Sequence, residues 1–69
     1  MRTLKPVEIV KTRDRLGMTQ ERFAETFHVS LWTLRNWEQG RSTPSGAASV
    51  LLWLLTKIPK PIMRALKSE

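Results

Sequence analysis

Apolar side chains recur along this chain at the spacing of three and four residues that is typical of α-helices, and no stretch alternates as a strand would. Thr19 and Ser30 stand where helix N-caps belong, and Gly17 and Gly40 stand where helices end. The pattern predicts five helices, over residues 6–16, 20–27, 31–38, 44–57 and a short segment that opens at Pro61. Because the connections are short, consecutive helices must pack together. We expect one all-α domain over residues 1–69.

The segment over residues 44–57 is apolar almost all round its expected helix, which should be capped by Thr43 and open at Pro44 before Pro59 ends it. A helix of this kind needs burial on more than one side. One interpretation is a two-fold dimer interface, made of Leu52, Trp53, Leu55, Ile62, Met63 and Leu66. The other interpretation is that all of these side chains fill one monomeric core.

Length and composition limit how such a domain can be stabilised. The chain has 69 residues and no Cys, so disulfides are excluded. One His and six acidic residues do not make a closed zinc site, and we expect neither a metal nor another cofactor. A domain this small is marginally stable on its own. Oligomerisation is therefore the remaining source of additional burial.

The chain is basic, with twelve Lys and Arg against six Asp and Glu, a net charge of +6, and no acidic residue from Gln39 to Ser68. This excess suggests an anionic partner, which could be nucleic acid, a membrane surface or an acidic protein. The longest apolar run, Val50 to Leu55, is far below the roughly 18 residues that span a bilayer. Binding to a membrane surface is disfavoured, because the basic residues are spread over caps and turns and the apolar positions fit a globular bundle better than one exposed face. An enzyme is disfavoured too, since the chain has no Tyr or Cys, no Gly-rich phosphate loop and no clustered acid pair. The lack of Cys and of a signal peptide suits a cytoplasmic protein.

Two segments contain most of a pair of short predicted helices that a tight turn joins. They are residues 17–24 (Gly-Met-Thr-Gln-Glu-Arg-Phe-Ala) and residues 29–41 (Val-Ser-Leu-Trp-Thr-Leu-Arg-Asn-Trp-Glu-Gln-Gly-Arg). They resemble the Xre family of helix-turn-helix DNA-binding domains, which includes the lambda-type phage repressors and Cro proteins. The resemblance implies a compact five-helix, lambda-repressor-like bundle with its helix-turn-helix at about residues 19–39. The continuation, Pro-Ser-Gly-Ala-Ala over residues 44–48 and then Leu51-Leu52, is more similar to Xre-type antitoxins of the HigA and MqsA kind, which are partnered with RelE-like toxins.

The helix over residues 31–38 is the expected recognition helix. Leu34 and Trp37 can serve the core, which leaves the opposite face free for the major groove of B-form DNA. The resemblance places base-reading side chains at Leu31, Trp32, Arg35 and Asn36. Arg can grip guanine, and Asn adenine, by paired hydrogen bonds. Trp32 could instead pack against a neighbouring helix or subunit, and the two polar members could form a merely solvated face.

Four other polar residues are candidates for phosphate contacts. Gln20 occupies the first turn of its helix, where the resembling domains bind a phosphate and brace the recognition helix. Ser30 is an N-cap whose hydroxyl could also contact a phosphate, and Thr33 either approaches the DNA backbone or is half-buried. Arg41 matches a family position that grips phosphate. The alternative for Gln20 and Arg41 is an ordinary solvated side chain.

Two further residue positions concern the stability of the motif. Arg13 lies on the apolar stripe of the first helix, and the resemblance pairs it with Glu38 in a partly buried ion pair. His28 occupies a turn position that is usually Gly in the family and that commonly needs a positive φ. His tolerates this backbone conformation better than most residues do, so we expect a structural role for it.

These observations predict a sequence-specific regulator that binds double-stranded DNA. As a dimeric repressor, it would place two recognition helices in successive major grooves of an inverted-repeat operator, about 34–36 Å apart. The alternative is an antitoxin that also neutralises a RelE-like toxin through protein binding.

Overall fold

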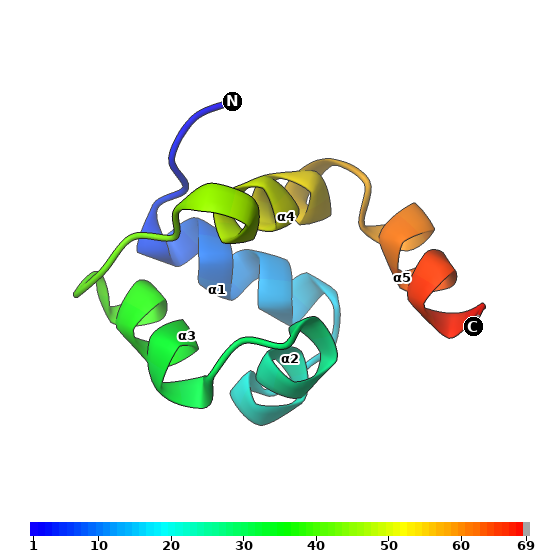
Figure 1. The fold of residues 1–69 in the computed structure, drawn as a ribbon, viewed down its shortest axis with the longest axis horizontal. Helices are drawn as coiled ribbons and strands as arrows, with labels where there is room; N and C mark the ends of the chain where they lie inside the picture. Colours follow the sequence, from blue (N-terminus) through cyan, green and yellow to red (C-terminus); the bar gives the residue numbers. More distant parts are fainter. Residues whose placement is uncertain (69) are drawn as a thin grey trace.

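The computed structural model describes residues 1–68, in which five helices and no strand occur (Figure 1). The helices are α1 (Pro6–Arg15), α2 (Gln20–Phe27), α3 (Leu31–Gln39), α4 (Gly46–Lys57) and α5 (Pro59–Lys67). The all-α prediction is confirmed. Helix α1 lies between α4 on one side and α3 on the other, while α2 packs against α3 and α5 packs against α4 (Figure 1).

Side chains cap α2 and α3 at the predicted positions. Thr19 Oγ1 accepts a hydrogen bond from the backbone N–H of Arg22 at 3.1 Å, and Ser30 Oγ accepts one from that of Thr33 at 3.0 Å. These bonds satisfy N–H groups that have no partner within the helix. Gly40, with a φ of 77°, ends α3 in the left-handed conformation. The first three helices therefore begin and end within one residue of their predicted bounds.

The prediction that α4 opens at Pro44 is wrong, because α4 begins at Gly46. Gly46 has a φ of 58°, and a right-handed helix cannot continue through such a residue. Pro44 is buried and lines a small cavity together with Leu4 and Leu52, so it anchors the loop to the core. The predicted cap, Thr43, accordingly lies in that loop and does not begin a helix.

Helix α5 begins at Pro59, not at Pro61 as predicted. The backbone of Ile58, with φ and ψ of −134° and 58°, is the break between α4 and α5. Both prolines fit the first turn of α5, since the N–H groups of a first turn have no partner within the helix. Pro59 thus both ends one helix and starts the next.

The most deeply buried side chains, 1% exposed or less, come from four helices: Ile9, Phe23, Leu34, Leu52 and Leu55. Leu52 and Leu55 face the core because a helix of 3.6 residues per turn places them on the side of α4 that packs on α1. The prediction of these two residues as dimer contacts is therefore wrong. Both side chains belong to the core of the monomer.

Helix α5 lies at the periphery of the bundle, beyond the end of α4 (Figure 1). None of the α5 residues is buried, and the helix is held mainly by α4, with Ile62 packing partly against the core. Its attachment is thus the weakest of the five helices. No helix within residues 1–68 is long and apolar enough to span a bilayer.

Candidate nucleic-acid interface

Helices α2 and α3 and the turn between them form a helix-turn-helix. His28 adopts the left-handed conformation, with φ and ψ of 57° and 42°, so the predicted positive φ is confirmed. The N–H of Val29 then donates to the carbonyl of Ala24 at 3.0 Å, which closes the turn. Phe23 and Leu34 hold the two helices together from inside the core. The relative orientation of the two helices is thereby fixed.

The outer face of α3 is made by Trp32, Arg35 and Gln39, which follow one another at helical spacing. Trp32 is the most exposed large apolar side chain of the described residues, at 74%. Arg35 and Gln39 are exposed as well. Gln39 was not among the residues predicted to face outward, although its spacing from Trp32 and Arg35 places it on the same face. This face offers a flat apolar ring, a guanidinium and an amide to a base-pair edge.

Two predicted base-reading residues do not share this face, so their predicted outward orientation is wrong. Asn36 is only 6% exposed. Its carbonyl accepts the N–H of Arg41 at 2.9 Å, where the left-handed Gly40 ends the helix. Leu31 is half-buried and packs against the core. Neither side chain is therefore part of the exposed outer face of α3.

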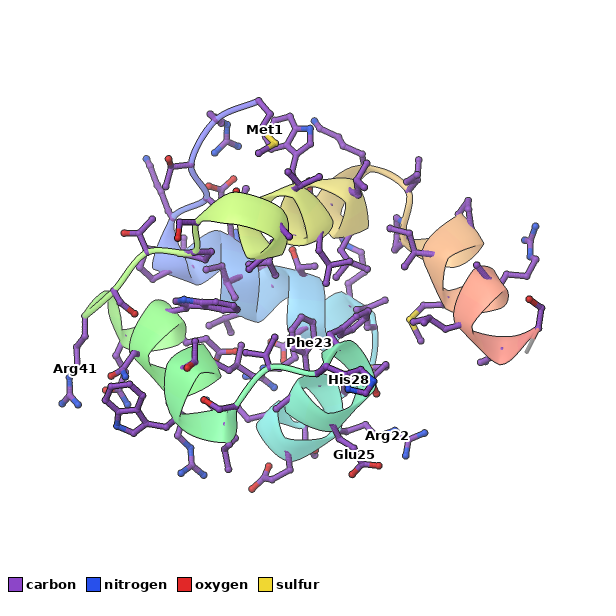
Figure 2. All side chains as sticks on the ribbon, viewed as in Figure 1. Met1, Arg22, Phe23, Glu25, His28 and Arg41 are labelled. Carbon is purple, nitrogen blue, oxygen red and sulfur yellow. The ribbon has the colours of Figure 1, made fainter. Side chains whose placement is uncertain are left out.

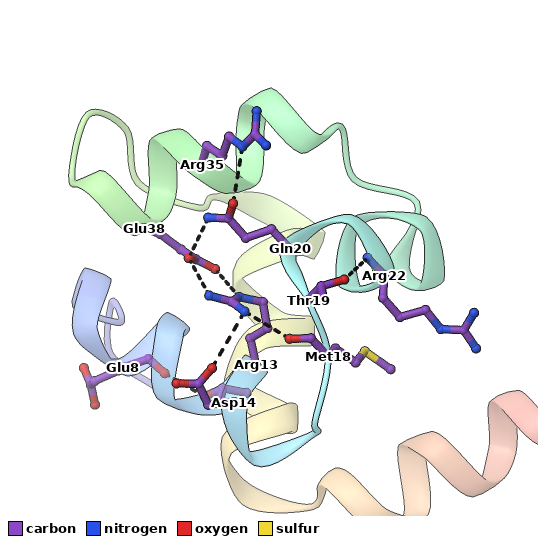
Figure 3. A network of polar contacts seen from close by, with 10 residues as sticks. Glu8, Arg13, Asp14, Met18, Thr19, Gln20, Arg22, Arg35 and Glu38 are labelled. Carbon is purple, nitrogen blue, oxygen red and sulfur yellow. Dashed lines mark hydrogen bonds and ion pairs between the residues drawn. The ribbon is translucent and has the colours of Figure 1, made fainter.

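A network of polar contacts joins α1 directly to α3 and attaches Gln20 of α2 to α3 as well (Figure 3). Nε and Nη2 of Arg13 donate to the two carboxylate oxygens of Glu38, at 2.8 and 3.1 Å. Gln20 Nε2 donates to the same carboxylate at 3.0 Å, and Gln20 Oε1 accepts from Arg35 Nε at 3.3 Å. The structure therefore brings Arg13 against Glu38 and sets Gln20 as the bridge from that pair to the outer face of α3.

The Arg13–Glu38 ion pair is largely shielded from solvent, with side chains 14% and 6% exposed. The hydrogen bond to Glu38 raises the pKa of Arg13 above its ordinary value, which keeps the guanidinium charged. Arg13 Nη1 also donates to the carbonyl of Met18 at 3.0 Å, so one side chain fastens the α1–α2 loop as well. Removing one partner of such a shielded pair leaves the other charge without its counter-ion, so the pair opposes any separation of α1 from α3.

Two side chains of α2 contact the guanidinium of Arg35. Besides the bond to Gln20, its Nη2 lies 3.8 Å from a carboxylate oxygen of Glu21. Both partners of that ion pair are exposed, and exposed pairs contribute little. A ligand can therefore replace Glu21 at the guanidinium without a large loss of stability.

The candidate phosphate ligands lie at both ends of α3. Ser30 Oγ donates to Thr33 Oγ1 at 2.7 Å in addition to its capping bond, so its hydroxyl is used twice. The hydroxyl proton of Thr33 is then the one left to donate outward. Arg41 projects from the loop after α3 into solvent (Figure 2). Among residues 1–68, no group of three or more His, Asp or Glu side chains is placed to bind a metal ion.

A second exposed surface runs along α4. Val50, Leu54 and Ile58 recur every four residues and are 39–46% exposed, and we call them the α4 stripe. They lie on a different side of the helix from the buried Leu52 and Leu55. The apolar surplus predicted for this helix is present, but its exposed part includes neither Leu52 nor Leu55.

The other predicted dimer contacts are divided between two surfaces. Ile62 and Met63 of α5 are half-buried and Leu66 is exposed, so α5 adds apolar surface at its own edge of the bundle. Trp53 is half-buried and lies about 100° around the axis of α4 from the centre of the α4 stripe. Its ring contacts cations instead, with Lys57 Nζ 4.8 Å from the ring centroid.

A family model described as helix-turn-helix matches residues 9–52, which include α2, α3 and most of α1. The chain therefore belongs to the helix-turn-helix family, and its fold is that of an Xre-type DNA-binding domain. It is similar to the protein named antitoxin HigA-2 of Vibrio cholerae serotype O1, with 44% identity over 59 residues. The match covers 86% of this chain and 57% of that relative, so the chain spans little more than half of the relative's length.

Proposed function

We propose that this protein is a sequence-specific transcriptional regulator that reads the major groove of double-stranded DNA with α3. The observation that carries the proposal is the outer face of α3, which is free of the core and braced from behind by Gln20 and Glu38. A helix can enter the groove only by a face that the core does not need. A braced side chain also loses less conformational entropy when it binds.

Arg35 is the principal base-reading residue in this proposal. Gln20 holds its Nε, which leaves the two terminal nitrogens to donate to O6 and N7 of one guanine once Glu21 is displaced. A bidentate contact of this kind discriminates against the wrong base by about 1–3 kcal/mol. Trp32 contributes contact with thymine methyl groups or sugars, and Gln39 takes the place that the sequence assigned to Asn36.

The phosphate contacts position α3 without reading sequence. Thr33, together with the exposed cap Ser30, lies at one end of the helix, and Arg41 lies at the other. The first turn of α2 adds backbone N–H groups, with the second amide proton of Gln20 beside them. Contacts of this kind make the affinity depend strongly on salt.

The regulator acts as a two-fold dimer in this proposal, with the α4 stripe and Leu66 of α5 as its contact surface. These side chains form the main apolar surface that the monomer leaves exposed on its C-terminal helices. An isologous dimer would bury them against their own copies and supply the burial that a small domain lacks. Two copies of α3 would then address an inverted-repeat operator, with half-sites about 34–36 Å apart. Binding there represses a promoter that the operator overlaps.

Selection of bound duplexes from a random pool, followed by binding assays with variants, tests the DNA role. Arg35→Ala should weaken binding by about 1–3 kcal/mol and relax the preference at one base pair. Arg41→Ala should weaken binding to all sequences and lower the slope of log affinity against log salt by about 1. Arg64→Ala, the same change at an exposed position of α5, is the control. Weak binding without sequence preference would refute the proposal.

Sedimentation tests the dimer. Leu54→Lys should convert a dimer to a monomer, because it places a charge in the centre of the α4 stripe. Val7→Lys makes the same kind of change at an exposed apolar position of α1 and should leave the mass unchanged. A wild-type protein that sediments as a monomer would remove the dimer from the proposal while leaving the DNA role open.

A second function, toxin neutralisation, is favoured by the relative that bears the name antitoxin. In that case this chain would bind a RelE-like toxin as well as its own promoter. Co-expression with a RelE-like protein encoded beside it should yield a stable complex, and it should restore the growth of cells that the RelE-like protein alone inhibits. Failure of both, with operator binding intact, would leave a stand-alone regulator.

A further inference from the structure

A basic groove of about 280 Å³ lies between the N-terminal arm, α1 and α4. Its cationic side chains are Arg2, Lys11, Arg15 and Lys57, and its single carboxylate is Glu8. We call this set the basic groove. Neither the DNA-reading face of α3 nor the α4 stripe includes any of these residues.

The one carboxylate of the basic groove, Glu8, is already hydrogen-bonded within the chain. Arg2 Nη1 donates to Glu8 Oε1 at 2.7 Å, its Nη2 donates to the other oxygen, and the N–H of Lys5 donates to Oε1 at 2.9 Å. Lys11, Arg15 and Lys57 form no ion pair with any carboxylate of residues 1–68. The groove therefore has three positive charges that the described chain does not neutralise.

Trp53 gives the basic groove an apolar floor. Lys57 Nζ lies 4.8 Å from the ring centroid and Arg2 Cζ lies 5.6 Å from it, so cations flank the ring. A half-buried indole among cations can accept the aliphatic part of a side chain whose carboxylate reaches a neighbouring ammonium or guanidinium. An inorganic anion would make no use of such a floor.

The groove lies on a different side of the bundle from α3. Helix α1 separates α4 from α3, and Met1 lies beside α4 while Arg41 projects from the end of α3 (Figures 1 and 2). A duplex seated on α3 is therefore remote from the groove. A partner packed on the α4 stripe also approaches from another side of α4 than the one that carries Trp53.

We propose that the basic groove binds an acidic helical segment of a partner protein. Lys11 and Arg15 are one helical turn apart on α1, so they match two Glu residues that are also one turn apart on a helix laid alongside. Lys57 takes a third carboxylate, and Trp53 packs against the apolar stems between them. The pairing of Arg2 with Glu8 within the chain is a precedent for carboxylate binding at this place.

The test uses a fluorescein-labelled, alanine-based helical peptide with pairs of Glu four positions apart, titrated with the full chain and followed by anisotropy. The double variant K11E/R15E should bind the peptide about tenfold more weakly, since two attractions become repulsions. The control K60E/K67E makes the same charge change on α5, outside the groove, and should alter affinity by no more than about twofold. Lys57→Glu, on the other helix of the groove, should weaken binding in the same direction as K11E/R15E.

A labelled DNA duplex distinguishes the two classes of polyanion. Its affinity for K11E/R15E should equal that for K60E/K67E, because neither pair lies on the DNA-reading face. Equal peptide affinity of the two double variants would overturn the proposal. A loss of duplex binding confined to K11E/R15E would also overturn it, and would assign the groove to DNA instead. Both results are independent of the Arg35 variants that test the DNA role of α3.

Discussion

The helix-turn-helix and the C-terminal pair of helices are built on different principles. Helices α2 and α3 are capped by side chains, joined by a left-handed turn and tied to α1 through the Arg13–Glu38 pair. Helices α4 and α5 lack side-chain caps, and apart from the buried face of α4 they present apolar surface to solvent. The two regions are therefore fixed in different ways: polar contacts hold α3 in place, while exposed apolar surface remains at the C-terminal end of the bundle.

The largest effect should come from the buried face of α4. Leu55→Ala removes a fully buried side chain and should lower the free energy of unfolding by about 2–5 kcal/mol. Leu54→Ala, the neighbouring position on the α4 stripe, should cost the monomer well under that amount. Urea denaturation of both variants at a concentration where the chain is monomeric measures the difference. Equal losses would mean that the stripe is part of the monomeric core.

The second effect concerns the polar fastening of the helix-turn-helix. Glu38→Gln leaves the guanidinium of Arg13 largely shielded and without its carboxylate, and should lower the free energy of unfolding by about 2–3 kcal/mol. Breaking a fully buried pair costs more, about 3–5 kcal/mol. A double-mutant cycle with Arg13→Gln, measured by urea denaturation, should show strong coupling. Additive losses would contradict the role of this pair in joining α1 to α3.

A smaller effect is expected at the turn of the motif. His28→Gly relieves the left-handed strain of about 1–2 kcal/mol but adds backbone entropy of about 0.5–1 kcal/mol to the unfolded chain. Thermal unfolding should therefore find the variant neutral or slightly more stable than the wild type. His28→Val is the control and should be destabilised, because β-branched residues avoid a positive φ. A loss above about 1 kcal/mol in the Gly variant would mean that the imidazole makes a contribution beyond the backbone.

The same contrast explains how far the sequence alone predicted this molecule. The helix-turn-helix was predicted within one residue, because Thr19, Ser30 and Gly40 act locally through caps and a left-handed residue. The predicted starts of α4 and α5 were wrong for two reasons. The positive φ of Gly46 delays α4, and α5 begins at Pro59 directly after the predicted break, where Pro61 was also a suitable first-turn residue.

Within the candidate site, the sequence predicted which residues occur better than it predicted which way their side chains face. Asn36 and Leu31 were expected to face outward, yet Asn36 is buried and Leu31 packs against the core. Leu52 and Leu55 were assigned to a dimer because an all-apolar helix does not reveal which side its neighbours occupy. Tertiary contacts, not helical periodicity, settle such choices.

The smallest effect should be the pH dependence of a polar contact that burial does not support. The hydrogen bonds of Glu8 with Arg2, and then with the N–H of Lys5, lower the pKa of its carboxyl from 4.5 to about 2. A carboxyl whose pKa is lower in the folded state contributes stability above its unfolded pKa and loses it as the pH falls through its folded pKa. The stability difference between the wild type and Glu8→Gln should therefore be present at neutral pH and fade between pH 4.5 and about pH 2. Urea denaturation across that range measures it, with Glu25→Gln, an exposed carboxyl of α2, as the control.

Because the Arg2–Glu8 pair is open to solvent, the stability difference should be far smaller for Glu8→Gln than for Glu38→Gln. Shielding from solvent, rather than the number of charges, then determines which polar contacts hold this fold together. A difference that stays constant down to pH 2 would mean that Glu8 stabilises α1 by some means other than its charge.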